Sequence, residues 1–262
     1  MNLSIVIPVY NSEKIISALV EKISYHIKSN NLSTEIILVN DFSKDSSWEK
    51  IKILHRKYSY VKGINLENNY GQHNAIIAGL NFCKGDFCIL MDDDMQHDPK
   101  YIIDIYNKLK SGYEICYVKY LKRKHLKWKI FVSWLNNISA SILALKPIKI
   151  YTSSFKGFNK RILSNIVKYK EKEVFLDWLI LDQSKNIFIL DVLHQERMSG
   201  KTNYNFKKLM ELWSIMIIKI KAKSFFHNLW LFFPKIFIKF IVYPFVKKNN
   251  IKEQYKVLDK VF

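Results

Sequence analysis

Three consecutive carboxylates, Asp92, Asp93 and Asp94, have the spacing in this chain that most directly suggests chemistry. They follow the apolar segment 87–91, which has the character of a buried strand. Their charges repel one another, so we expect a cation beside them, and Mg²⁺ or Mn²⁺ prefers carboxylate and phosphate oxygen. If the segment is extended, Asp92 and Asp94 point the same way and Asp93 points oppositely. The pattern predicts a divalent ion on Asp92 and Asp94 that bridges a diphosphate; the alternative is a solvated acidic turn.

Polar clusters follow three other predicted strands in the same manner. These strands are 4–7, 35–39 and 61–66, and the clusters after them are 8–11, 40–45 and 68–75. In a parallel sheet the carboxyl ends of the strands meet at one edge, and ligands bind there. We therefore expect all four clusters to form one site.

Amphipathic segments separate the strands. Apolar residues at spacings of three and four predict a helix over 15–27, and similar patterns predict helices over 46–58, 73–82 and 99–110. Asp98 is the expected N-cap of the last helix, with Pro99 at its first position. Two further strands are predicted at 114–118 and 187–193. This alternation predicts an α/β fold with a mostly parallel sheet flanked by helices.

Taken in order, these motifs resemble glycosyltransferase family 2. The segment 91–99, Met-Asp-Asp-Asp-Met-Gln-His-Asp-Pro, is similar to the family signature Met-Asp-x-Asp-Leu-Gln-x-Pro-Pro. The segment 69–75, Asn-Tyr-Gly-Gln-His-Asn-Ala, is similar to the matching segment of the family's polyprenyl-phosphate branch. The resemblance covers residues 1–120 well and 185–215 loosely. It implies the GT-A nucleotide-sugar-binding fold, inverting transfer from a nucleotide diphosphate sugar, and Mg²⁺ or Mn²⁺ as cofactor.

The resemblance also implies roles for individual residues. Those that match nucleotide-binding positions are Pro8, Tyr10, Asn11, Asp41, Gly71, Asp92 and Asp93. Those that match metal- and diphosphate-binding positions are Asp92, Asp94 and Gln96. Asp41 matches the residue that accepts a hydrogen bond from the base. Asp94 and Arg197 are the expected catalytic residues, because both would stabilise the departing diphosphate. Ser12 stands where the family usually has an acidic residue, and Phe42 replaces a frequent Gly.

The acceptor-binding motif departs from the branch pattern. That pattern is Arg-x-x-Gly-x-Ser-Lys, whereas residues 197–203 read Arg-Met-Ser-Gly-Lys-Thr-Asn. Thr202 can replace the hydroxyl of the Ser, and Lys201 can serve in place of the missing Lys. The basic stretch that begins at Lys119 is a further candidate for binding a phosphate-bearing acceptor or anionic lipid, and the alternative is a solvated face.

Two acceptors stay open: a polyprenyl-linked lipid phosphate, which we favour, and a sugar hydroxyl of a growing glycan such as O-antigen or capsule. A hydroxyl must lose a proton as it attacks, so its transferase needs a positioned base. A phosphate oxygen is already largely ionised near neutral pH. Asp177 is the candidate base, and the alternative is that it is an ordinary surface helix residue.

The carboxyl-terminal part is basic and aromatic. The net charge of the chain is +19, and no acidic residue lies between Glu114 and Glu171. The longest uncharged run after Phe206, residues 224–234, is shorter than the roughly 20 residues of a spanning helix. We expect a GT-A domain over 1–205 and a basic amphipathic helical region over 206–262. That region is predicted to lie on an anionic membrane surface, and the alternative is a packed helical subdomain.

The cysteines bear on the cellular compartment of the protein, and the charge bears on whether it binds nucleic acid. Cys83, Cys88 and Cys116 form no CxxC pair, and the chain shows no signal-peptide pattern, so we expect a cytoplasmic protein on the inner face of the membrane. A basic, aromatic chain is also compatible with nucleic-acid binding, but no such motif occurs, and we expect no nucleic-acid partner. The intact Asp92, Asp94 and Gln96 set argues against a catalytically inactive nucleotide-binding module.

Overall fold

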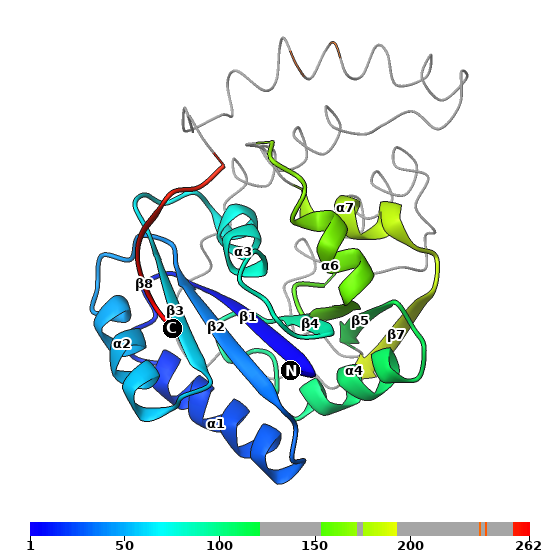
Figure 1. Cartoon of the computed structure of the whole chain (residues 1–262), viewed down its shortest axis with the longest axis horizontal. Coiled ribbons are helices and arrows are strands. Elements are labelled where there is room, and N and C mark those ends of the chain that lie inside the picture. Colours follow the sequence, from blue (N-terminus) through cyan, green and yellow to red (C-terminus); the bar gives the residue numbers. More distant parts are fainter. Residues whose placement is uncertain (121–152, 172–174, 193–235, 237–238, 240–253) are drawn as a thin grey trace, which may run out of the picture.

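The computed structural model of the chain describes residues 1–120, 153–171, 175–192, 236, 239 and 254–262 (Figure 1). Their strands are β1 (Leu3–Val9), β2 (Thr34–Asn40), β3 (Val61–Leu66), β4 (Phe87–Leu90), β5 (Ile115–Tyr120), β6 (Lys156–Asn159), β7 (Ile187–Val192) and β8 (Val257–Val261). Their helices are α1 (Ile16–Ser29), α2 (Ser47–Lys57), α3 (Gln72–Leu80), α4 (Tyr101–Lys110), α6 (Lys160–Ile166) and α7 (Leu176–Gln183).

These strands form one sheet in the order β7-β5-β6-β4-β1-β2-β3-β8. The pairs β1–β2, β1–β4, β2–β3 and β5–β7 are parallel, whereas β6 pairs antiparallel with β4 and β5 and β8 antiparallel with β3. Within the described chain, six strands therefore run in one direction, and β6 and β8 run against them. The predicted α/β class with a mostly parallel sheet is confirmed.

Helices cover both faces of the sheet. Residues of α1, α2 and α4 pack into one apolar cluster, and residues of α3, α6 and α7 pack into the other. Figure 1 shows the two groups on opposite sides of the strands. The central strands β1 and β2 are buried along their whole length, as expected of strands covered on both faces. This burial fixes their carboxyl ends, from which the polar loops extend.

The predicted elements of residues 1–118 are found, and their boundaries differ from the predicted ones by about one or two residues. The helix predicted from Pro99 begins at Tyr101, and Lys100 occupies the N-cap position with no side-chain cap. The amide of Tyr101 donates to the carbonyl of Asp98, and the amide of Ile102 to that of Pro99, so the chain enters α4 through tighter i→i+3 bonds. The Asp98 carboxylate accepts from the amide of Lys100 at 3.1 Å, which is the bond expected of the predicted cap, although the regular helix begins later, at Tyr101.

Strand β8 ties residues 254–262 to the amino-terminal part of the sheet. It pairs with β3, and the Gln254 amide donates to the carbonyls of Tyr169 and Glu171 at 3.2 and 3.0 Å. The rings of Phe82 and Phe262 lie 5.1 Å apart. The end of the predicted 206–262 region is thus an edge strand of the sheet rather than helix.

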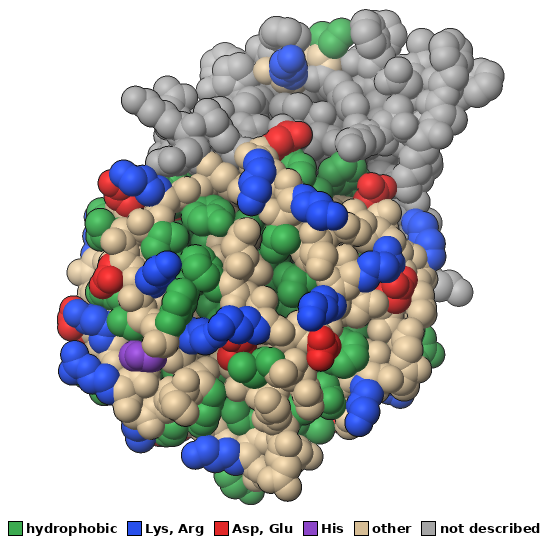
Figure 2. Space-filling view, viewed as in Figure 1, with side chains coloured by type: hydrophobic (Ala, Val, Ile, Leu, Met, Phe, Trp, Pro, Cys, Tyr) green, Lys and Arg blue, Asp and Glu red, His purple; other side chains and the backbone are tan. Residues whose placement is uncertain are grey.

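Charge on the described surface is mixed. Figure 2 shows Lys and Arg side chains spread over one face among acidic and hydrophobic ones, and not gathered into a single patch. None of the helices that the structure describes combines the length and the hydropathy needed to cross a bilayer.

Candidate active site

The loops after β1, β2 and β4 are bonded to one another at the carboxyl edge of the sheet. The amide of Tyr10 donates to Asp93 Oδ2 at 3.1 Å, and the Ser12 hydroxyl donates to the same oxygen. The amide of Asn11 donates to Ser43 Oγ at 3.0 Å, and the amide of Lys44 donates to Asn11 Oδ1 at 2.8 Å. Three loops that are far apart in sequence therefore form one rigid rim, as the strand-end pattern predicts.

Asp93 connects the acidic cluster to the loop after β1. Burial raises the pKa of the Asp93 carboxyl to about 6, and the charges of Asp92 and Asp94 add to the rise against the hydrogen bonds from Ser12 and Tyr10. Its hydrogen-bond partners differ from those of Asp92. In this structure Asp93 positions the loop that carries Tyr10.

Asp92 lies between α3 and the loop after β4. The Gln72 amide donates to Asp92 Oδ1 at 2.6 Å, and His97 Nε2 lies 3.4 Å from Asp92 Oδ2. Burial alone would raise the pKa of the Asp92 carboxyl, but hydrogen bonds with His97 and Ser154 and the charge of Lys156 hold it below its ordinary value. The carboxylate is therefore kept ionised, as a cation ligand must be.

His97 orients this carboxylate. Its ring is stacked with that of Tyr120 at 5.7 Å, and His97 Nδ1 is bonded to the Tyr120 hydroxyl. His97 Nε2 also lies 3.0 Å from Ser154 Oγ. Because a carboxylate can only accept, Nε2 must carry a proton where it bonds Asp92. His97 therefore orients the polar groups of Asp92, Tyr120 and Ser154.

Asp41 fixes the loop between β3 and α3. Its two carboxylate oxygens accept from the amides of Tyr70 and Gly71 at 2.8 and 2.9 Å. Gly71 has φ of 85°, a conformation that side chains disfavour, and it precedes the first residue of α3. These two bonds hold the Asp41 carboxylate at the start of α3, beside the loop after β2.

Asp94 and Gln96 complete the acidic loop. Asp94 Oδ1 accepts from the amide of Gln96 at 3.1 Å, and Met95 between them has φ of 63°. In the described part of the chain no three or more His, Cys, Asp or Glu side chains are grouped as a metal site. Asp92 and Asp94 nevertheless supply hard oxygen donors, which suit Mg²⁺ or Mn²⁺ sharing its coordination with a diphosphate. The donor chemistry fits such an ion.

A buried ion pair lies on the α7 side of the acidic cluster. The Lys156 ammonium on β6 donates to Asp177 Oδ1, and their side chains are 4% and 14% exposed. The Tyr117 hydroxyl donates to the same oxygen at 2.9 Å, and the Lys156 ammonium lies 5.4 Å from the centroid of the Tyr117 ring. Burial and the charge of Asp177 raise the pKa of the Tyr117 hydroxyl well above its ordinary value. Asp177 is therefore a buried counter-ion and not a surface helix residue.

The structure gathers most of the predicted site residues at this edge. Pro8 is buried within β1, directly before the loop of Tyr10 and Asn11. Lys119 lies further off, in an exposed ion pair with Asp191 of β7 at 3.8 Å. The predicted phosphate-binding residues Arg197, Lys201 and Thr202 lie outside the described residues.

Sequence reasoning missed Lys156, Tyr117 and Ser154. Lys156 stands in the run Phe155-Lys156-Gly157-Phe158, and a single Lys in an otherwise apolar run was the available signal. Tyr117 and Ser154 gave no such signal, because their roles depend on pairing across the sheet.

Comparison with known proteins agrees with this architecture. The family described as glycosyl transferase family 2 matches residues 4–167. The undecaprenyl-phosphate 4-deoxy-4-formamido-L-arabinose transferase of Photorhabdus laumondii is 29% identical over 210 residues, which are 80% of this chain and 65% of that protein. The match thus spans slightly less than two thirds of that relative.

Solved structures show the same fold. Staphylococcus aureus TarS in complex with UDP-GlcNAc superposes with a TM-score of 0.59 and 19% identity, over 92% of this chain and 73% of that one. Glucosyl-3-phosphoglycerate synthase from Mycobacterium tuberculosis, with Mn²⁺, UDP and phosphoglyceric acid, superposes with a TM-score of 0.62 and 16% identity, over 83% and 76%. The expected GT-A fold is confirmed.

Proposed function

Because the chain belongs to glycosyl transferase family 2, we propose that it transfers a glycosyl group from a nucleoside diphosphate sugar to a polyprenyl phosphate. The observation that carries the donor half is the bonded rim of Tyr10, Ser12 and Asp93 beside Asp92. It places several ordered polar groups where parallel sheets bind ligands. The comparison with structures holding UDP and UDP-GlcNAc supports a uridine nucleotide as the first candidate.

Asp92, Asp94 and Gln96 would hold Mg²⁺ or Mn²⁺ in this proposal, and Arg197 would contribute a second positive charge. A bound divalent ion supplies charge neutralisation to the diphosphate that leaves. His97 and Gln72 keep Asp92 oriented for this role. Asp93 would hold the loop of Tyr10 in place by accepting from the Tyr10 amide and the Ser12 hydroxyl.

The acceptor half rests on Asp177. A general base must take a proton from the attacking hydroxyl, but Asp177 Oδ1 already accepts from Lys156 and Tyr117 in a largely buried pair. A phosphate oxygen needs no such base. In the proposed step this oxygen attacks the anomeric carbon from the face opposite the diphosphate. The new C–O bond forms as the old one breaks, the diphosphate leaves with the electron pair, and the configuration inverts.

The relative from Photorhabdus laumondii supports this acceptor, since it is named an undecaprenyl-phosphate 4-deoxy-4-formamido-L-arabinose transferase. The proposal places the protein at the inner face of a membrane, where the basic residues of segment 206–248 would contact anionic lipid. The competing acceptor, a sugar hydroxyl of a glycan, is one outcome of the test.

The test is a transfer assay with radiolabelled nucleotide sugars. A screen of sugar nucleotides by thermal shift with Mn²⁺ first selects the donor, because a ligand that binds the native state raises its stability. The selected donor is then incubated with undecaprenyl phosphate in detergent or with lipid-linked glycan. Label in an alkali-stable, lipid-extractable monophosphate supports the proposal, and label only in the glycan rejects the lipid-phosphate acceptor.

A further inference from the structure

Phe42 is an exposed aromatic residue in a backbone conformation that bulky side chains avoid. It follows Asp41 at the end of β2, its φ is 58°, and it is 46% exposed. Positive φ is common for Gly and Asn but a rarity for a large side chain. Such conformations persist where neighbouring structure imposes them, and they concentrate at functional sites.

Core packing does not account for Phe42. Three of the four non-glycine residues with positive φ in the described chain lie at this edge: Asn11, Phe42 and Met95. Asn11 is of a type that tolerates the conformation. Met95 is 4% exposed and belongs to the core cluster, so packing explains its side chain. Phe42 alone combines a bulky side chain, positive φ and high exposure.

The residues on either side of Phe42 are held firmly. Asp41 bonds the amides of Tyr70 and Gly71, and its own amide donates to the carbonyl of Val9 at 2.9 Å. Ser43 Oγ accepts from the amide of Asn11 at 3.0 Å. The hydrogen bonds of Asp41 and Ser43 therefore fix the backbone on both sides of Phe42. The Phe42 ring is held in place before any ligand binds.

A second exposed ring belongs to the adjacent strand. The register of β1 and β2 pairs Val9 with Asn40, so Tyr10 and Asp41 come next on the two chains. Neighbouring strands are about 4.8 Å apart. Tyr10 is 36% exposed, and its amide is fixed by Asp93. Tyr10 and Phe42 thus belong to the loops that leave two paired strands, and Phe42 directly follows Asp41, the expected acceptor for a base N–H.

We propose that Phe42 is a stacking platform for the base of the nucleoside diphosphate. Aromatic rings bind bases through their π faces whichever base is present. Phe42 would therefore add affinity for any nucleoside, while Asp41 selects among bases by accepting a hydrogen bond. The inference rests on the proposed function, which supplies the nucleotide, and it adds a base-contacting residue at a position where the family frequently has Gly.

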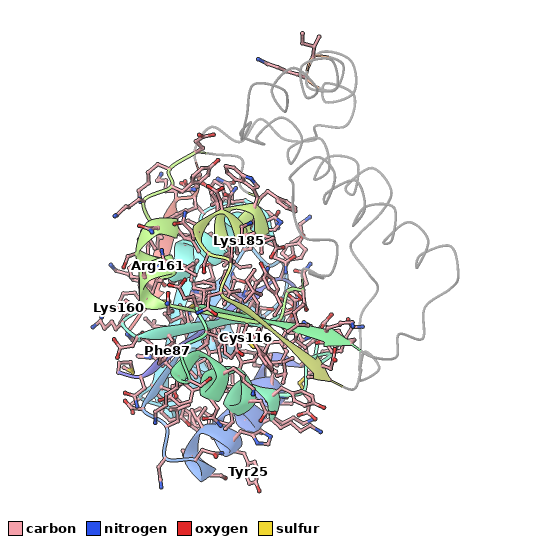
Figure 3. The ribbon with its side chains drawn as sticks, turned by 90° about the vertical axis from the view of Figure 1, so that its right-hand side faces the viewer. Tyr25, Phe87, Cys116, Lys160, Arg161 and Lys185 are labelled. Atoms are coloured by element: carbon pink, nitrogen blue, oxygen red, sulfur yellow. The ribbon has the colours of Figure 1, made fainter. Side chains whose placement is uncertain are left out.

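The experiment measures ligand affinity by calorimetry with Mn²⁺ present, using UDP, CDP and GDP, and inorganic pyrophosphate as a ligand without a base. Wild-type protein is compared with Phe42→Gly and Phe42→Tyr. The matched control is Tyr25→Ala, which removes an exposed ring from α1, at the outer end of the described structure (Figure 3). Stacking on one ring is worth a factor of about 5 to 150 in affinity.

Phe42→Gly is expected to weaken the best nucleotide about fivefold or more and to leave pyrophosphate binding unchanged. Phe42→Tyr and Tyr25→Ala should match wild type. The thermal midpoint of Phe42→Gly should stay within about 3 °C of wild type, because relief of the positive φ offsets the lost apolar contacts.

Two results would overturn the inference alone: nucleotide affinity of Phe42→Gly within twofold of wild type, or an equal loss for nucleotide and pyrophosphate, which would indicate a distorted loop. If wild-type protein bound none of the three nucleotides, the proposed function would fail and this inference with it.

Discussion

The Lys156 ammonium and the Asp177 carboxylate form a buried ion pair that joins β6 to α7. Lys156 lies opposite Leu90 in the register of β4 and β6, and Leu90 stands two residues before Asp92 in the chain. The charge of Lys156 helps to keep Asp92 ionised. One buried cation thus faces the acidic cluster and α7 together. The pair therefore connects the proposed donor site to α7, the helix that carries the candidate base Asp177.

The first prediction concerns the stability of this pair. Removing one partner of a buried ion pair leaves an uncompensated charge and typically costs about 3–5 kcal/mol. We expect Lys156→Met and Asp177→Leu each to lower the free energy of unfolding by about this amount. The double variant should lose less than the sum of the single losses, because neither charge is left alone. Urea unfolding of the three variants measures the coupling, and additive losses would show that the two residues do not interact.

The second prediction concerns pH and Glu35, at the opposite edge of the sheet. Glu35 accepts from the Ser4 hydroxyl, the Lys84 amide and the Lys62 ammonium, each at 2.6 Å. Burial raises the pKa of the Glu35 carboxyl, but these hydrogen bonds outweigh burial and lower it overall. Since the folded pKa lies below the unfolded value of about 4.3, the stabilisation is present above that pH and is lost as pH falls through the folded pKa.

Glu35→Gln should therefore destabilise the protein by about 3 kcal/mol at pH 7, and the difference from wild type should shrink below about pH 4. Thermal or urea unfolding between pH 3 and pH 8 provides the measurement. The control is Glu49→Gln, which removes an exposed pair with Lys52 and should change stability by at most about 0.5 kcal/mol. A pH-independent difference for Glu35→Gln would contradict the assigned cause.

The elements around the donor site were predictable because their signals are local. The strands β1 and β2 are continuous apolar runs, and the pattern of α1 repeats every three to four residues. Strand β8 was not predictable in this way, since Val257–Val261 is mostly exposed and is defined by pairing with the distant β3.

Lys156 shows why part of the site was missed. A lysine in a four-residue segment with Gly157 and Asn159 is more typical of a solvated loop than of a buried strand. Only the antiparallel insertion of β6 between β4 and β5 buries it. The interpretation of Asp177 depends on Lys156: the sequence offered Asp177 as a candidate base, and its ion pair with Lys156 shows a counter-ion.

The third prediction concerns the metal. Chelation with EDTA should abolish transfer, and Mn²⁺ or Mg²⁺ should restore it. Asp94→Asn should reduce kcat by about a hundredfold or more, because loss of a Lewis acid costs several kcal/mol in the transition state. Asp104→Asn, on the exposed face of α4, is the control and should retain activity. Near-wild-type turnover of Asp94→Asn would reject the assigned ligand.

The fourth prediction concerns the membrane. Residues 206–248 lie outside the described residues except Ile236 and Lys239, and their Trp, Phe and Lys content predicts binding to anionic vesicles that weakens at high salt. Deleting 206–262 would be a poor test, because it removes β8 from the sheet. Full-length protein with Trp213→Ala and Trp230→Ala should float less with phosphatidylglycerol vesicles than wild type. Absence of wild-type flotation at low and at high salt would reject membrane contact.

The last prediction separates the two acceptors through Asp177. If the acceptor is a phosphate, Asp177 serves Lys156 only, and Asp177→Asn should lower stability while leaving kcat on polyprenyl phosphate within a few-fold of wild type at a temperature where the variant is folded. If the acceptor is a sugar hydroxyl, loss of a base should cost about a hundredfold or more. Asp182→Asn, exposed on the same helix, controls for changes in α7. Circular dichroism confirms folding before each assay, and the pH profile of kcat adds a second readout. A hundredfold loss in a folded variant, accompanied by loss of the acidic limb of that profile, would assign a glycan hydroxyl as the acceptor. We expect unchanged turnover, because Asp177 already serves as the counter-ion of Lys156 and accepts from Tyr117.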